Sequence, residues 1–214
     1  MGVLYALGSA LFLVPAVVSL WSSADAVFVA FFAGSICFTT AATLQVVAAF
    51  ETPHRLLTRD PHPLRPRAWM PARVDWLSAA IQWPGTLLFN LNTYDAMDRA
   101  LGSMAQDVRV WTPDMIGSAC FLVSSLLAFA NTEHRWLSWR PRDLDWLIGA
   151  ANLLGAVAFG VSAIAAYVRP DGGSELSDTV AALGTAIGAL GFLVGAVLLL
   201  MQDAATLRSR SCRR

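Results

Sequence analysis

The fold is decided by a stretch that reads Gly117-Ser118-Ala119-Cys120-Phe121-Leu122-Val123-Ser124-Ser125. A glycine is followed four residues later by a phenylalanine, and seven and eight residues later by small or short polar residues. At about 100° per residue, these positions share one stripe of an α-helix that is about 100° wide. We therefore predict a helix-packing surface that recurs in six apolar segments. Its glycine–phenylalanine pairs are Gly8/Phe12, Gly34/Phe38, Gly85/Phe89, Gly117/Phe121, Gly155/Phe159 and Gly188/Phe192.

The chain is far more apolar than a typical soluble domain. Of its 214 residues, 56% are hydrophobic and only 14% are charged, whereas soluble domains carry about 25% charged residues. Its six apolar runs approach the ~20 residues needed to cross a bilayer, and their interiors contain no Asp, Glu, Lys, Arg or His. Because a lipid-exposed backbone must satisfy its hydrogen bonds internally, we predict an all-α, polytopic membrane helix bundle with six transmembrane helices. The predicted spans are Val3–Trp21, Val27–Phe50, Trp76–Tyr94, Met115–Asn131, Trp146–Val168 and Thr179–Met201.

A longer repeat joins these spans in pairs. Trp, Pro, Asp, Trp and Leu precede the third span and recur 70 residues later, before the fifth. We expect Asp75 and Asp145 in this lead-in to cap helix N-termini, and Trp76 and Trp146 to lie at the membrane interface. We predict one integral membrane domain, 1–214, made of three two-helix repeats. Its parts are the hairpins 1–50, 69–131 and 139–201, a cytoplasmic loop 51–75 and a cytoplasmic tail 202–214.

The distribution of arginine predicts the orientation. The chain has fifteen basic residues, all arginine, and twelve of them lie in the segments 1–2, 51–75, 132–145 and 202–214. Because cytoplasmic segments carry the excess of basic residues, we predict a multi-pass protein of the cell (plasma or inner) membrane with cytoplasmic N- and C-termini. The expected partners are the lipid bilayer, with anionic headgroups at the cytoplasmic face, and a second copy or another membrane protein. No nucleic acid is expected.

A few uncharged polar side chains lie on or near the shared stripe. Gln82 and Asn152 each precede a motif glycine by three residues, so they occupy equivalent positions in two spans. The first cluster comprises Tyr5, Gln45, Gln82 and Asn152, all close to the predicted cytoplasmic side, and a smaller second cluster comprises Asn92 and Thr93. These side chains either hold neighbouring helices together, the interpretation we favour, or line a polar cavity that opens to the cytoplasm.

The sequence contains no recognisable catalytic motif. It has no nucleophile–base arrangement, no phosphate-binding glycine loop and no acidic pair within a span, and its three cysteines have no metal-ligand or pairing spacing. General acid–base chemistry requires a titratable group within reach of the substrate. We therefore predict that the chain is not an enzyme and has no cofactor and no metal site.

The hairpins resemble the YrhK-like family of small bacterial membrane proteins, whose two helices share a Gly-Ser/Thr-x-x-Phe type core. The closest stretches run from Met115 to Ser125 and from Ile187 to Gly195. The second stretch departs from the pattern, because Ala189 stands where the motif has Ser or Thr. The resemblance covers helices 3–6 best, and it implies a membrane location without an assigned reaction.

Two functions remain open at this point. The favoured one is a non-enzymatic structural, accessory or sensory helix bundle. The alternative is a channel or carrier for small solutes or ions that uses uncharged polar side chains. The lack of ionisable residues within the spans argues against proton-coupled transport, but amides and carbonyls can line a pore without charge.

Overall fold

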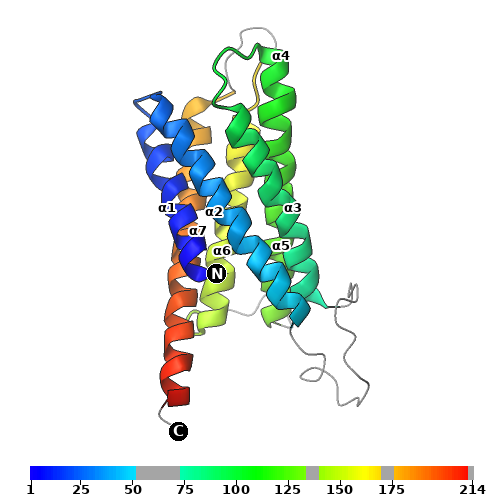
Figure 1. Cartoon of the computed structure of the whole chain (residues 1–214), viewed down its shortest axis with the longest axis vertical. Coiled ribbons are helices and arrows are strands. Elements are labelled where there is room, and N and C mark those ends of the chain that lie inside the picture. The colour runs from blue at the N-terminus through cyan, green and yellow to red at the C-terminus, as the bar shows by residue number, and fades with distance from the viewer. Residues whose placement is uncertain (52–72, 134–139, 170–175, 212–214) are drawn as a thin grey trace.

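The computed structural model describes residues 1–51, 73–133, 140–169 and 176–211, and this part of the chain is helical (Figure 1). Two short elements, α4 (Ser103–Gln106) and the π-helix η2 (Asp107–Trp111), lead into the fourth long helix. The long helices are α1 (Gly2–Val18), α2 (Asp25–Glu51), α3 (Val74–Asp95), α5 (Thr112–Glu133), α6 (Leu144–Ala165) and α7 (Asp178–Ser211). Each predicted span falls largely within one of them.

Four helices are long and apolar enough to cross a membrane, judged by length and composition. These segments are Asp25–Phe50, Ser103–Ala130, Leu144–Ala165 and Asp178–Ala205. The apolar helix α1 has 17 residues, and α3 has 22 residues but carries amides and hydroxyl groups along its length. The apolar helices therefore indicate a membrane location.

Some predicted parts lie beyond the described residues. Most of the predicted cytoplasmic loop, residues 52–72, is among them, and so are residues 212–214 at the end of the predicted tail. The rest of that tail is helical, because α7 continues to Ser211.

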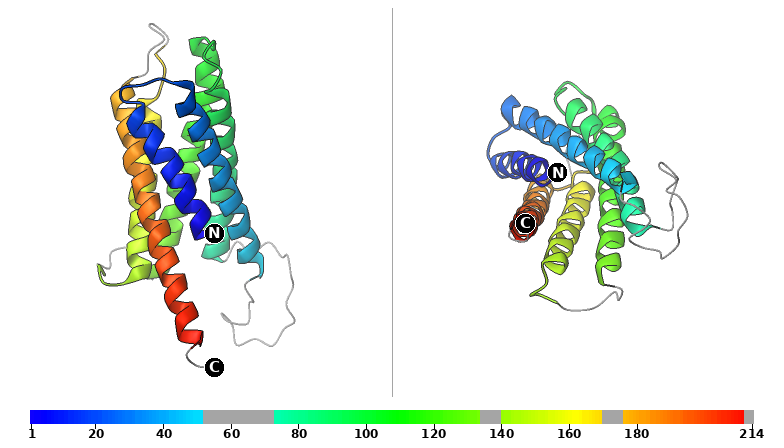
Figure 2. Two further views of the ribbon diagram at one scale, coloured as in Figure 1. Left: turned by 60° about the vertical axis from the view of Figure 1, so that its left-hand side comes forward. Right: turned by 60° about the horizontal axis from the view of Figure 1, so that its bottom comes forward.

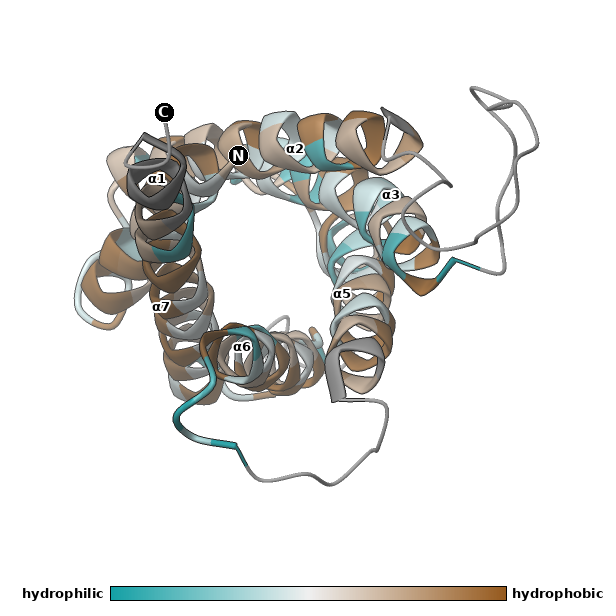
Figure 3. Cartoon of the chain, turned by 90° about the horizontal axis from the view of Figure 1, so that it is seen from below, coloured by the Kyte–Doolittle hydropathy of each residue, from teal (hydrophilic) through white to brown (hydrophobic). Residues whose placement is uncertain are grey.

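The six long helices form a closed ring. Each helix packs against its neighbours in chain order, and α7 closes the ring by packing against α1. Seen along the bundle, the ribbons surround a central axis, and the three hairpins α1–α2, α3–α5 and α6–α7 follow one another around it (Figures 2 and 3).

Paired glycines allow the two helices of each hairpin to approach closely. A Cβ atom added to Gly117 would lie 3.1 Å from the backbone oxygen of Gly85, and the reverse distance, from Gly85 to the oxygen of Gly117, is 3.2 Å. The same distance, from an added Cβ to the backbone oxygen of the facing glycine, is 3.1 Å in both directions for Gly8 and Gly34. It is 2.9 Å from Gly155 to Gly188 and 3.0 Å in the reverse direction. Lipid supplies no hydrophobic drive for helix association, so small residues that permit such backbone contact favour packing.

The stripe that contains these glycines faces the interior of the ring. All six motif phenylalanines are only 4–7% exposed. The residue after each motif glycine is 0% exposed: Ser9, Ser35, Thr86, Ser118, Ala156 and Ala189. Large apolar side chains such as Leu7, Leu91 and Leu154 lie on the outer surface, each at least 50% exposed. This distribution suits a ring of helices that has apolar surroundings and a filled centre.

Candidate functional site

The centre of the ring is closed by two layers of phenylalanine rings, which we call the plug. The layer that is higher in the orientation of Figure 1 comprises Phe12, Phe89 and Phe159, whose ring centroids lie 5.8–6.4 Å apart. The lower layer comprises Phe38, Phe121 and Phe192, at 5.6–6.2 Å. Within each hairpin, the centroid of the upper ring lies 5.2–5.7 Å from the centroid of the lower ring.

The plug leaves almost no free space. The space enclosed by the six rings and Ser35 has a volume of about 10 Å³, at the lower limit for one water molecule. The Ser35 hydroxyl already pairs with the Phe32 carbonyl at 2.8 Å and with the Thr93 hydroxyl at 3.0 Å. A water molecule here would therefore find few hydrogen-bonding partners.

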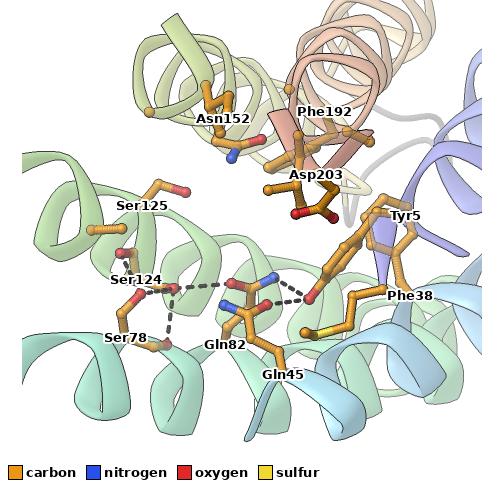
Figure 4. A pocket seen from close by; sticks show the side chains of 17 residues that line it. Tyr5, Phe38, Gln45, Ser78, Gln82, Ser124, Ser125, Asn152, Phe192 and Asp203 are labelled. Carbon is orange, nitrogen blue, oxygen red and sulfur yellow. Dashed lines mark hydrogen bonds between the residues drawn. The ribbon is translucent and has the colours of Figure 1, made fainter. Parts of the chain in front are cut away.

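A polar cavity of about 390 Å³ lies below the plug, and we call it the lower cavity. Phe38 and Phe192 of the lower layer form its apolar end. Its polar side chains converge from all six long helices (Figure 4). They are Tyr5, Gln45, Ser78, Gln82, Ser124, Ser125, Asn152 and Asp203.

A chain of hydrogen bonds runs along one wall of the lower cavity and joins four helices. The Tyr5 hydroxyl donates to Oε1 of Gln45 at 2.6 Å and accepts from Nε2 of Gln82 at 3.3 Å. The Ser124 hydroxyl lies 2.9 Å from the Ser78 carbonyl and 3.2 Å from Oε1 of Gln82, and its one proton is shared between these two acceptors. The Ser78 hydroxyl in turn donates to the Ser124 carbonyl at 3.0 Å. The chain fixes the orientation of the Gln82 amide.

Asn152 lies on the opposite wall of the same cavity (Figure 4). The structure thus brings all four side chains of the first predicted cluster to one cavity, but only three of them are joined by hydrogen bonds. Asn152 packs against Gly195, where an added Cβ would collide with its Oδ1 atom. Gly195 therefore makes room for the amide.

A second cavity, the upper cavity, lies above the plug and has a volume of about 330 Å³. All three rings of the upper layer line it, together with the second predicted cluster, Asn92 and Thr93. Both side chains are buried, with 8% and 6% exposure. On another wall, the Ser162 hydroxyl donates to the Ala181 carbonyl and pairs with the Thr185 hydroxyl, both at 2.7 Å.

Several polar residues of the two cavities were not among the predicted site residues. Ser124, Ser125 and Ser162 occupy the small-residue positions of the stripe, which we interpreted as packing positions alone. Ser78 lies four residues before Gln82, on the same face of α3. These positions were a usable signal, because a serine on an interior stripe supplies a hydroxyl as well as small size.

The charged side chains that line the cavities, among the residues described, are all carboxylates. Asp203 lines the lower cavity, near the end of the membrane-length part of α7, and Asp114 and Asp178 line the upper cavity from the first turns of their helices. The described segments contain no group of three or more His, Cys, Asp and Glu side chains that could hold a metal ion. The polar groups available to a solute deep in either cavity are therefore hydroxyls and amides.

The apolar plug is a less favourable environment for charged groups than for uncharged polar ones. Moving an unpaired amide or hydroxyl from water into a medium without hydrogen-bonding partners costs about 4–8 kcal/mol, whereas an isolated ion costs tens of kcal/mol. A narrow apolar constriction also excludes water. In this arrangement, the free-energy barrier to crossing the plug is therefore far higher for ions than for small neutral molecules.

Comparisons of the chain with protein-family models, curated proteins and solved structures found no match.

Proposed function

We propose that the chain is an integral membrane protein that provides a passage for small solutes along the axis of the ring. One observation carries this proposal: two polar cavities lie on opposite sides of an apolar plug inside a closed ring of helices. Hydroxyls and amides from several helices line each cavity, an arrangement that packing alone does not require.

The proposal includes six spanning helices with both termini in the cytoplasm. The polar residues of α3 favour this count, because Gln82, Asn92 and Thr93 line the cavities instead of facing lipid. The 17 residues of α1 correspond to about 26 Å at ~1.5 Å per residue, which is close to the hydrocarbon thickness. The arginine distribution supports the orientation.

The proposal also treats the three hairpins as repeats around the axis. Each hairpin contributes one pair of facing glycines, one phenylalanine to the upper layer and one to the lower layer. Passage then requires the two layers to separate or rotate, and the structure corresponds to the closed state. Because each layer borders a different cavity, opening one layer at a time would admit a solute without connecting the two sides.

A structural or accessory bundle is the second candidate. The tight contacts of the plug favour it, since six mutually packed aromatic rings also stabilise a core. The two candidates predict different permeabilities when phenylalanine rings are removed from the plug.

The test is the permeability of proteoliposomes that contain the Phe89→Ala/Phe121→Ala double variant. The centroids of these two rings lie 5.2 Å apart, and the rings belong to different layers. We expect the variant to raise glycerol permeability, measured by stopped-flow light scattering, at least about tenfold over the unsubstituted protein, because removal of both rings lets water enter the constriction. Phe129→Ala is the control, since Phe129 packs on Trp146 outside the plug.

A folded double variant whose vesicles are no more permeable than those with Phe129→Ala would contradict the passage. That outcome would leave the structural bundle as the better account.

A further inference from the structure

We infer that the lower cavity is a binding site for a small uncharged molecule that carries both hydrogen-bond donors and acceptors. This inference names the class of solute for the passage proposed above and rests on that proposal for the solute's route. It is carried by the hydrogen-bonding groups that remain unused on the cavity walls.

Ser125 is the first of these groups. It is only 9% exposed and lines the cavity, yet its hydroxyl makes no hydrogen bond with the other residues that the structure describes. Its neighbour Ser124, by contrast, is 1% exposed and bonds to both Ser78 and Gln82. Because Ser125 lines the open space of the cavity, a molecule held there can supply the partner that its hydroxyl lacks.

Asn152 supplies a full amide from the neighbouring helix. Its side chain points into the cavity in Figure 4 and bonds to no other described side chain. The contact with Gly195 limits where this amide can move. Asn152 therefore offers one acceptor and two donors in a defined place.

The facing wall offers a complementary set. Oε1 of Gln45 accepts from Tyr5, so the Nε2 group of the same amide remains available as a donor within the described part of the chain. The hydrogen bonds of Gln82 to Tyr5 and Ser124 hold the wall in place. A solute between the walls would thus meet donors and acceptors on both sides.

The size and charge of the cavity define the class of ligand. A volume of about 390 Å³ falls in the range of small-molecule sites. The walls carry amides and hydroxyls, and the lining carboxylate, Asp203, is exposed. Because amides and hydroxyls make up the polar lining apart from this one carboxylate, an uncharged molecule such as a small amide or polyol fits better than an anion.

The test is thiol modification of Ser125→Cys in the full chain with the native cysteines replaced by alanine, purified in detergent. We expect neutral hydroxyethyl methanethiosulfonate to react at least about tenfold faster than its trimethylammonium and sulfonate analogues, because the charged reagents lose hydration without compensation. Acetamide and glycerol, used as probes, should slow the neutral reagent. Asn152→Ala should abolish that slowing.

Two controls keep the result interpretable. Leu154→Cys, on the outer face of α6 and 60% exposed, should show no protection by either probe. Thermal unfolding should show that each variant is folded, and Asn152→Gln, which retains an amide, should keep partial protection if Asn152→Ala loses it.

Failure of the site and failure of the passage give different results. Protection without flux through the plug variant would retain the binding site and overturn the passage. Equal reaction rates for the three reagents, or no slowing by either probe, would overturn the binding site even if flux is seen. Faster reaction of the trimethylammonium reagent would also overturn it, in favour of a cation.

Discussion

The two cavities differ in how their polar groups are satisfied. In the upper cavity, the hydroxyls of Thr93 and Ser162 bond to carbonyls of nearby helix turns and pair with Ser35 and Thr185. In the lower cavity, long side chains form a network that joins four helices. Each cavity also holds an amide without a side-chain hydrogen bond among the described residues, Asn92 in the upper cavity and Asn152 in the lower one. The hydrogen bonds of the upper cavity therefore join helices in pairs, whereas those of the lower cavity tie four helices together.

The largest expected effect comes from the hairpin contacts on which both cavities depend. Gly155→Leu should lower the free energy of unfolding by about 3 kcal/mol, because the added side chain must fit where a Cβ already lies 2.9 Å from the Gly188 oxygen. The measurement is unfolding in mixed micelles. Ala119→Leu, at an exposed position of α5, should be nearly neutral, and equal losses in the two variants would place the packing surface elsewhere.

Smaller losses in the free energy of unfolding are expected in the lower cavity, and they should differ between its two walls. Gln82→Leu removes two hydrogen bonds and leaves Tyr5 and Ser124 with fewer partners, so it should cost about 1–2 kcal/mol. Asn152→Ala should cost less, because that amide makes no side-chain bond in the described structure. The same unfolding assay measures both changes. A greater loss in Asn152→Ala would mean that Asn152, not Gln82, holds the helices together.

The smallest effect is expected in the upper cavity. Thr93→Val keeps the side-chain shape, and Ser35 retains its bond to the Phe32 carbonyl. The cost should be about 0.5–1 kcal/mol, with no change in the protection of Ser125→Cys by acetamide. If Thr93→Val abolished that protection, the two cavities would not be independent and the contrast between them would fail.

The apolar runs and the glycine stripe were sufficient to predict where the helices lie. The repeated stripe also identified the residues that face the interior, including all six plug phenylalanines. The closed ring could not be predicted in this way. A stripe defines which face of a helix is packed, but it does not say which helix lies opposite, and the contact between α7 and α1 joins segments from opposite ends of the chain.

The predicted roles of the lead-in residues were partly wrong. Trp76 and Trp146 are only 4% and 9% exposed and pack on Phe50 and Phe129, so both rings are core residues, and their position at the membrane interface stays a prediction. Asp143, not Asp145, is the N-cap of α6, where it accepts a hydrogen bond from the Asp145 backbone. Local sequence favours an acidic residue near the helix start, but the backbone angles of the first turn decide which one caps it.

The candidate site was only half predictable for a related reason. The positions of Gln82 and Asn152 relative to their glycines indicated a common depth, and both residues line the lower cavity. Their different roles depend on neighbours from other helices: Gln82 meets Tyr5 and Ser124, whereas Asn152 meets Gly195. The division of the plug into two layers likewise depends on the relative shift of the helices, which no single helix encodes.

The most direct test of the account is the accessibility of one cysteine on each side of the plug in intact cells. Ser162→Cys faces the upper cavity and Ser125→Cys faces the lower one. A small, membrane-impermeant thiol reagent added outside should modify position 162 but not position 125. In the Phe89→Ala/Phe121→Ala background, it should modify both. Continued protection of position 125 in that folded background, or modification of position 125 with the plug intact, would contradict a passage closed by the six phenylalanines.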